Sequence, residues 1–162
     1  MVLVDYAASK SGETAYGLLS EFRATLACDG ASNFNKAVTR NGLSVALCND
    51  HARRRFHKVC AGMGNEKAAG PIAQQGLQWY RRLYAIERDI KDLPVELKYE
   101  QRQAWAVPLW AEFIVWARQV QSQGVAHAGT RDALSYLVKH ANSCNIAAMT
   151  AVCRSPASNP ST

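Results

Sequence analysis

Two short apolar segments, separated by a helix-length stretch, constrain the fold of this chain more than any other feature. Residues 24–28 and 43–48 each lead into an acidic residue, Asp29 and Asp50 respectively. Turn residues bound both segments, which is typical of buried strands, and residues 33–40 between them are long enough for a crossover helix. In open α/β sheets, functional groups gather at the carboxyl ends of parallel strands. We therefore expect Asp29 and the residues around Asp50 to lie at a functional site.

Strands and helices alternate through Cys60. Residues 2–6 read as a first strand, and Ser11 is suited to cap a helix that runs to about Phe22. The basic segment that starts at His51 reads as the helix after the third strand. This order predicts an α/β fold with a parallel or mixed sheet.

The character of the sequence changes after Cys60. Apolar residues recur every three or four positions in residues 72–93 and 95–123, which predicts two long helices. Pro108 should kink or split the second of them. Thr130 is suited to cap a third helix that ends near Ala141. Residues 143–162 show no clear period, end in Ser, Pro and Asn, and are predicted to be disordered.

Aromatic and aliphatic residues line one face of each long helix. The two stripes consist of Trp79, Leu83, Ile86, Ile90 and Leu93, and of Trp105, Leu109, Phe113, Trp116 and Val120. Such stripes predict a core where the two helices pack. The alternative is that the tryptophans stack on nucleobases.

A cluster of positive charge opens the helix after the third strand. Arg53, Arg54, Arg55 and Lys58 lie in its first turns, and the whole chain has a formal charge of +6. Cations at a helix N-terminus oppose the helix dipole, so their position is easier to explain if a polyanion lies nearby. The alternative is a solvated face paired with Asp50 or with glutamates elsewhere.

Two further constellations could carry chemistry. Asp29 at a strand end suits a metal-binding carboxylate, although Asp29-Gly30 is equally a turn sequence. Cys48 and His51 have a spacing found in zinc sites, but zinc needs four ligands and no second pair is evident. A buried cysteine and a helix-capping histidine are the structural alternative.

The expected compartment follows from what the sequence lacks. The start of the chain has no signal-peptide pattern, and no stretch of about 18 apolar residues occurs that would cross a membrane. Five widely spaced cysteines argue against a disulfide framework. We therefore expect a cytoplasmic protein without a membrane partner.

Four segments taken together resemble the insertion-sequence 66 family of transposases. In chain order they are VLVDYAASKSGETAYGLLSEF, LACDGASNFN, LCNDHARRRF and LYAIERDIKDLP. The resemblance covers about residues 2–142. It departs from the family at Ala31 and Asn49, where the family usually has aromatic residues.

The resemblance implies a DDE-type transposase. Residues 1–60 would form part of an RNase H-like core, and residues 61–142 a helical insertion. Asp29 would be one catalytic acid and a Mg²⁺ ligand. Cys48, His51, Arg53, Arg54 and Phe56 would match the family's C-x-x-H-x-R-R-x-F pattern. Arg53, Arg54, Arg55 and Lys58 would contact DNA.

The resemblance also implies that two acids of the triad are missing. The first should precede Met1, and the last should follow the insertion, yet no acidic residue lies beyond Asp132. One base deleted after the Asn142 codon would turn a family-like continuation that contains DDGRLPIS into the present sequence up to Ser155. Residues 143–162 are therefore interpreted as an out-of-frame tail.

The expected protein is therefore a truncated, inactive transposase fragment. Its parent would cleave and transfer DNA strands with Mg²⁺. The non-enzymatic alternative is a basic DNA- or protein-binding remnant that associates with full-length transposase or forms a homo-oligomer. An unrelated α/β enzyme that uses Cys48 or His51 is a third interpretation.

Overall fold

A computed structural model describes residues 9–62 and 70–149 of the 162-residue chain. Strands β1 (Thr25–Cys28) and β2 (Ser44–Leu47) form a parallel two-stranded sheet. A short 3₁₀ turn η1 (Ser32–Phe34) and helix α2 (Asn35–Asn41) make the crossover between them. Gly42, with φ of 62°, ends α2 in the left-handed conformation that glycine tolerates best. The predicted parallel pair and its crossover helix are confirmed.

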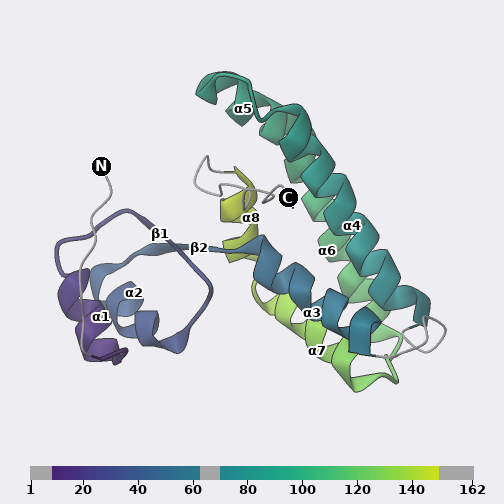
Figure 1. Cartoon of the computed structure of the whole chain (residues 1–162), viewed down its shortest axis with the longest axis horizontal. Coiled ribbons are helices and arrows are strands. Elements are labelled where there is room, and N and C mark those ends of the chain that lie inside the picture. Colours follow the sequence, from purple (N-terminus) through teal and green to yellow (C-terminus); the bar gives the residue numbers. More distant parts are fainter. Residues whose placement is uncertain (1–8, 63–69, 150–162) are drawn as a thin grey trace, which may run out of the picture.

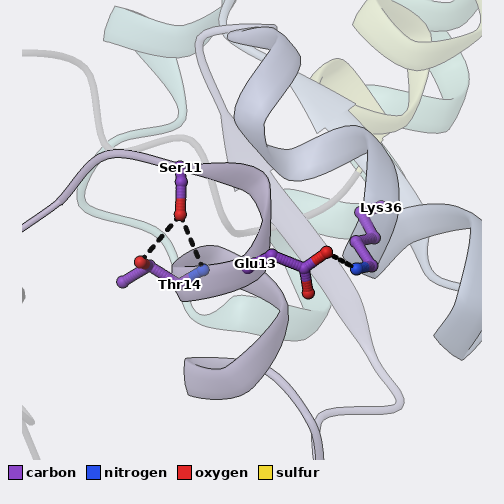
Figure 2. Close-up of polar contacts among 4 residues, drawn as sticks. All are labelled: Ser11, Glu13, Thr14 and Lys36. Atoms are coloured by element: carbon purple, nitrogen blue, oxygen red, sulfur yellow. Dashed lines mark hydrogen bonds and ion pairs between the residues drawn. The ribbon is translucent and has the colours of Figure 1, made fainter.

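Helix α1 (Gly12–Leu18) begins at the predicted cap. The Ser11 hydroxyl accepts a hydrogen bond from the Thr14 amide at 3.2 Å (Figure 2). Glu13 forms an ion pair with Lys36 of α2, which ties the two helices together. Both helices lie together at one end of the molecule (Figure 1).

The end of α1 differs from the prediction. The helix stops at Leu18 rather than near Phe22. The Leu19 carbonyl, which a longer helix would use internally, instead accepts a hydrogen bond from Asn41 Nδ2 at 2.6 Å. A tertiary contact therefore replaces the last predicted turn.

The described residues form a mostly helical structure with one small sheet. They contain two strands, and the third strand expected at residues 2–6 lies outside the described residues. The α/β mixture is present, but the structure does not confirm an RNase H-like core. Within residues 9–62 and 70–149, no helix combines the length and apolar character needed to cross a membrane.

Helices make up the remainder of the described chain. They are α3 (Asn49–Gly62), α4 (Gly70–Asp89), α5 (Val95–Gln101), the π-helical turn η2 (Arg102–Ala106), α6 (Val107–Ser122), α7 (Ala128–Lys139) and α8 (Ala141–Met149). Helices α4 and α6 run side by side as a long hairpin with α5 at its far end (Figure 1). Helix α3 packs against both α4 and α7.

The predicted break near Pro108 occurs as a π-helical turn. Proline lacks an N–H and its ring crowds the carbonyl four residues earlier, here that of Ala104 within η2. The wider turn relieves that conflict without ending the helix. The buried Arg102 on η2 pairs in bidentate fashion with Glu87 of α4, with N–O distances of 2.8 and 2.6 Å. This pair fastens the two halves of the hairpin to each other.

Aromatic rings form the core of the helical part, as the two stripes predict. Phe113 is fully buried, and its ring stacks on that of Trp79 with centroids 5.5 Å apart. Tyr80 meets Phe113 edge to face at 5.1 Å. The prediction that Trp105 belongs to the core is wrong, because 63% of its surface is exposed. The π-helical turn shifts the phase of the face, so Trp110 is buried instead.

The predictions for the last helices were partly wrong. The N-cap of α7 is His127, whose Nδ1 accepts from the Thr130 amide at 3.1 Å, so Thr130 is not the cap. Residues 143–149, predicted to be disordered, belong to α8. This helix packs on β2, buries Cys144 and supplies the Ala141 carbonyl that Trp110 Nε1 binds at 3.2 Å. Residues 150–162 lie outside the described residues.

Candidate functional site

A cleft of about 840 Å³ lies where the turn after β1 meets α3 and α7. Its lining includes Asp29, His51, Arg54, Arg55 and Lys58. In the sequence Asp29 lies 22 or more positions before the other four residues. The crossover of the parallel sheet brings them together, as expected for strand carboxyl ends.

Asp29 lies in an exposed turn at the edge of this cleft. Its Oδ1 accepts a hydrogen bond from the Ala31 amide at 3.0 Å, and Gly30 follows with φ of 84°. This is the turn geometry typical of an Asp-Gly pair. The structure therefore contains the turn that was the alternative interpretation of Asp29-Gly30. Within the described residues, no donor forms a hydrogen bond with Oδ2 of Asp29.

The basic residues of α3 divide between two surfaces. Arg54 and Lys58 are exposed and line the cleft, and Arg55 lines it from a half-buried position. Arg53 does not line the cleft: it binds Asp50 at 3.0 Å and lies 6.0 Å from the ring of Tyr84 on α4. Arg53 therefore belongs to the α3–α4 contact.

The Asp50 carboxylate offsets part of the repulsion between the arginines and the positive end of the helix dipole at the start of α3. It lies in the first helical turn, where a carboxylate is favourable, and it binds Arg53 at 3.0 Å and Arg54 at 2.8 Å. Tyr84 is largely buried beside this pair, and burial raises its pKa, with the Asp50 charge adding to the effect. In the part of the chain that the structure describes, Lys58 makes no ion pair, so its charge faces solvent across the cleft.

Helix α7 contributes cleft residues that sequence reasoning missed. Asp132 Oδ2 binds Arg55 Nη1 at 2.6 Å, and the guanidinium of Arg55 lies 4.0 Å from the centre of the Tyr136 ring. Burial, followed by nearby Cys144, raises the pKa of Tyr136 although Arg55 opposes the shift. The four-residue spacing of Asp132 and Tyr136 marks one helix face, but only the fold shows that this face meets α3.

The described residues of the cleft offer few of the oxygen ligands that a magnesium site uses. Mg²⁺ prefers oxygen ligands from one or more carboxylates. Asp29 offers one carboxylate, while Asp132, the other carboxylate in the cleft, is engaged by Arg55. Across residues 9–62 and 70–149, no three His, Cys, Asp or Glu side chains converge in a way that could hold a metal ion.

The structure places one member of the second predicted motif, Cys48 with His51, at the cleft. His51 lines the cleft, whereas Cys48 does not. The two residues are joined through the backbone, where the His51 amide donates to the Cys48 carbonyl at 3.1 Å. Cys48 is partly rather than fully buried, and His51 is an exposed residue within α3 rather than its cap, so the structural alternative does not match in these details either.

The sequence is similar to a known protein family and to a protein from Sinorhizobium fredii. A family model described as "Transposase IS66 family" matches residues 1–150. An "Uncharacterized protein y4hP" from Sinorhizobium fredii is 26% identical over 104 residues, which cover 60% of this chain. The match spans 19% of that relative's length. No solved structure matches the chain with statistical significance.

Proposed function

Because the chain belongs to the IS66 family of transposases, we propose that the cleft between α3 and α7 binds the phosphate backbone of duplex DNA. The single observation that carries the proposal is the convergence of Arg54, Arg55 and Lys58 in one cleft beside the Asp29 turn. Lysine and arginine side chains supply most of the affinity for DNA by displacing counterions from phosphates. Arg53 is left out because it does not line the cleft and lies against Tyr84 of α4 instead.

We propose further that this chain binds DNA without cutting it. Two-metal strand cleavage requires several carboxylates that converge on ions about 4 Å apart. Among the described cleft residues, Asp29 is the one carboxylate that no arginine engages. The family implies a divalent metal, and Asp29 is the residue that would contribute to holding it. Incubation of the chain with supercoiled DNA and Mg²⁺ should therefore leave the DNA intact, and metal-dependent nicking would contradict this part of the proposal.

The binding test compares two variants that lose the same charge. In Arg54→Gln/Lys58→Gln both changes lie in the cleft, whereas in Arg81→Gln/Arg88→Gln both lie on exposed positions of α4. Fluorescence anisotropy with a short labelled duplex should show about a tenfold loss for the cleft variant, equivalent to about 1.4 kcal/mol. The control should lose much less.

Salt dependence provides the second readout. Each lost phosphate contact should reduce the slope of log affinity against log salt concentration by about 0.9. The cleft variant should therefore lose about two such increments, and the α4 variant about none. Equal losses in both variants would show that only the overall charge matters, and the cleft would then not be the DNA site.

A second candidate function is self-association through the α4–α6 hairpin. Most of the large hydrophobic side chains exposed in the described residues lie on residues 95–122, here called the α5–α6 limb: Val95, Leu97, Tyr99, Trp105 and Val115. Leu18 on α1 is the exception. Trp105 borders a groove of about 660 Å³ on this limb. A protruding indole next to a groove on the same surface is suited to a two-fold contact, in which each copy fills the other's groove.

Charge at the groove also fits a second copy of this chain. Arg82 and Glu112 both line the groove and form an ion pair at 4.0 Å, so the groove carries both signs of charge. A two-fold contact would bring the positive side of one copy to the negative side of the other. Sedimentation velocity should show dimers that Trp105→Ser disrupts and Leu18→Ser leaves intact. A monomeric wild type, or equal effects of both substitutions, would contradict self-association. High salt should not dissociate the dimer, because the contact is mainly apolar.

A further inference from the structure

Arg55 is held on two sides by residues of α7. Asp132 binds one edge of its guanidinium at 2.6 Å, and the Tyr136 ring lies under its face at 4.0 Å. A guanidinium over an aromatic ring is attracted by the negative face of the ring, and more strongly when water is excluded. The guanidinium has five N–H donors, so these two contacts leave donors available for a phosphate.

The Tyr136 ring also contacts a second residue of α7. The imidazole of His140, one helical turn further along α7, lies 4.5 Å from it between ring centres. The ring is half-buried, so it has less freedom than an exposed tyrosine. Arg55 therefore rests on a surface that α7 holds in place.

The other end of Tyr136 reaches the turn that carries Asp29. A β-carbon built on Gly30 would lie 3.4 Å from the Tyr136 hydroxyl and 3.3 Å from Leu47 Cδ2. Tyr136 thus spans the distance between the Asp29 turn and Arg55. One side chain of α7 therefore contacts Arg55 and also lies next to the Asp29 turn.

We propose that Tyr136 is a positioning residue, which holds Arg55 beside the Asp29 turn so that the guanidinium meets a DNA phosphate there. The inference rests on the proposed DNA-binding function and deepens it. It assigns to the aromatic face of Tyr136 the task of limiting the rotamers of Arg55. Ordering the arginine before binding lowers the entropy lost when the phosphate arrives.

The test is a double-mutant cycle between Tyr136 and Arg55. Tyr136→Leu should weaken duplex DNA binding by about threefold to fivefold, in line with a cation–π contact. Tyr136→Phe, which keeps the ring, should bind almost as the wild type does. In an Arg55→Ala background, Tyr136→Leu should cause little further loss, because the group that it positions is already absent.

A matched control uses the pair formed by Tyr16 and Arg40. The guanidinium of Arg40 lies 5.2 Å from the Tyr16 ring, and neither residue lines the cleft. Tyr16→Leu should leave DNA affinity unchanged. Circular dichroism melts of every variant identify a loss of fold, and binding is measured well below each melting midpoint.

The outcomes separate this inference from the function on which it rests. If the wild type fails to bind DNA, or if the cleft and α4 charge variants bind alike, the proposed function fails and this inference falls with it. If the wild type binds as proposed but the effects of Tyr136→Leu and Arg55→Ala simply add, the positioning role alone is overturned. Equal losses in Tyr136→Phe and Tyr136→Leu would overturn it as well.

Discussion

The ring of Phe56 on α3 lies directly against Gly76 on α4. A β-carbon built on Gly76 would come within 2.5 Å of Phe56 Cδ1, closer than two carbons can approach. Phe56 is fully buried, so its ring has little room to retreat. The absence of a side chain at Gly76 therefore lets α3 and α4 pack closely and sets the position of the basic helix.

Gly76→Ala should consequently destabilise the protein. The added methyl group overpacks the contact with Phe56, which typically costs about 1–3 kcal/mol and outweighs the helix propensity gained from alanine. Urea unfolding followed by circular dichroism measures the change. Gly17→Ala is the control, because nothing lies within 4 Å of a β-carbon there. A stabilising Gly76→Ala would contradict the close packing.

The Arg102–Glu87 pair should contribute strongly to the stability of the hairpin. Arg102 is buried and Glu87 is partly buried, so Glu87→Gln leaves a buried guanidinium facing a neutral amide. We expect a loss of about 2 kcal/mol, below the ~3–5 kcal/mol of a fully buried pair because Glu87 keeps some solvent contact. Glu112→Gln, which touches the exposed pair with Arg82, should cost less than about 0.5 kcal/mol. Equal losses of stability for Glu87→Gln and Glu112→Gln in thermal unfolding would show that burial does not strengthen the Arg102–Glu87 pair.

Replacement of Tyr80 by phenylalanine should make the folded protein more stable. Its side chain is fully buried, and within the described residues its hydroxyl has no hydrogen-bond partner. An unsatisfied buried hydroxyl costs about 1–3 kcal/mol, so Tyr80→Phe should raise the free energy of unfolding by about 1 kcal/mol. A loss of stability instead would indicate that the hydroxyl is satisfied.

Tyr80 should also govern part of the alkaline unfolding. Burial, with Cys144 and two tyrosines adding to the effect, raises the pKa of Tyr80 above its ordinary value of 10.0. The unfolded chain then releases this proton at a lower pH than the folded chain, so stability is complete below about pH 10 and falls above it. Tyr80→Phe should remove part of this decline in urea titrations at alkaline pH. An unchanged decline would assign it to other groups.

His140 should lower the free energy of unfolding at mildly acidic pH. Burial, followed by the positive charges of Lys139 and Arg55, lowers the pKa of His140 below its ordinary value of 6.5. The unfolded chain therefore binds the proton first as pH falls through about 6.5, and stability decreases until the folded form also protonates. His140→Gln should flatten that step in thermal melts between pH 5 and 7. An unchanged step in this variant would contradict the assignment.

Sequence reasoning predicted the local elements near the sheet with good accuracy. The two strands are short apolar segments, and the Ser11 cap, the crossover helix and the basic helix follow from side-chain chemistry within a few residues. The break near Pro108 follows likewise from a missing N–H and a crowded carbonyl. Each of these is decided by neighbours in the chain.

The errors fall where distant residues compete with local preference. Residues 143–149 lack a helical pattern, yet α8 forms because β2 and Trp110 supply partners for it. Trp105 has the spacing of a core residue, but the π-helical turn rotates it to the surface. In both places a contact or a backbone adjustment outside the local window overrides the pattern.

The sequence by itself determined which groups this protein can offer, namely a carboxylate after one strand and a run of positive charge after the next. Only the tertiary structure decided which of them meet. It turned Arg53 toward Tyr84 and away from the cleft, and it brought Asp132 and Tyr136 from 77 or more positions away to hold Arg55. The physical reason is that helix periodicity fixes the face on which a side chain lies, whereas the packing of α3 between α4 and α7 decides what that face meets.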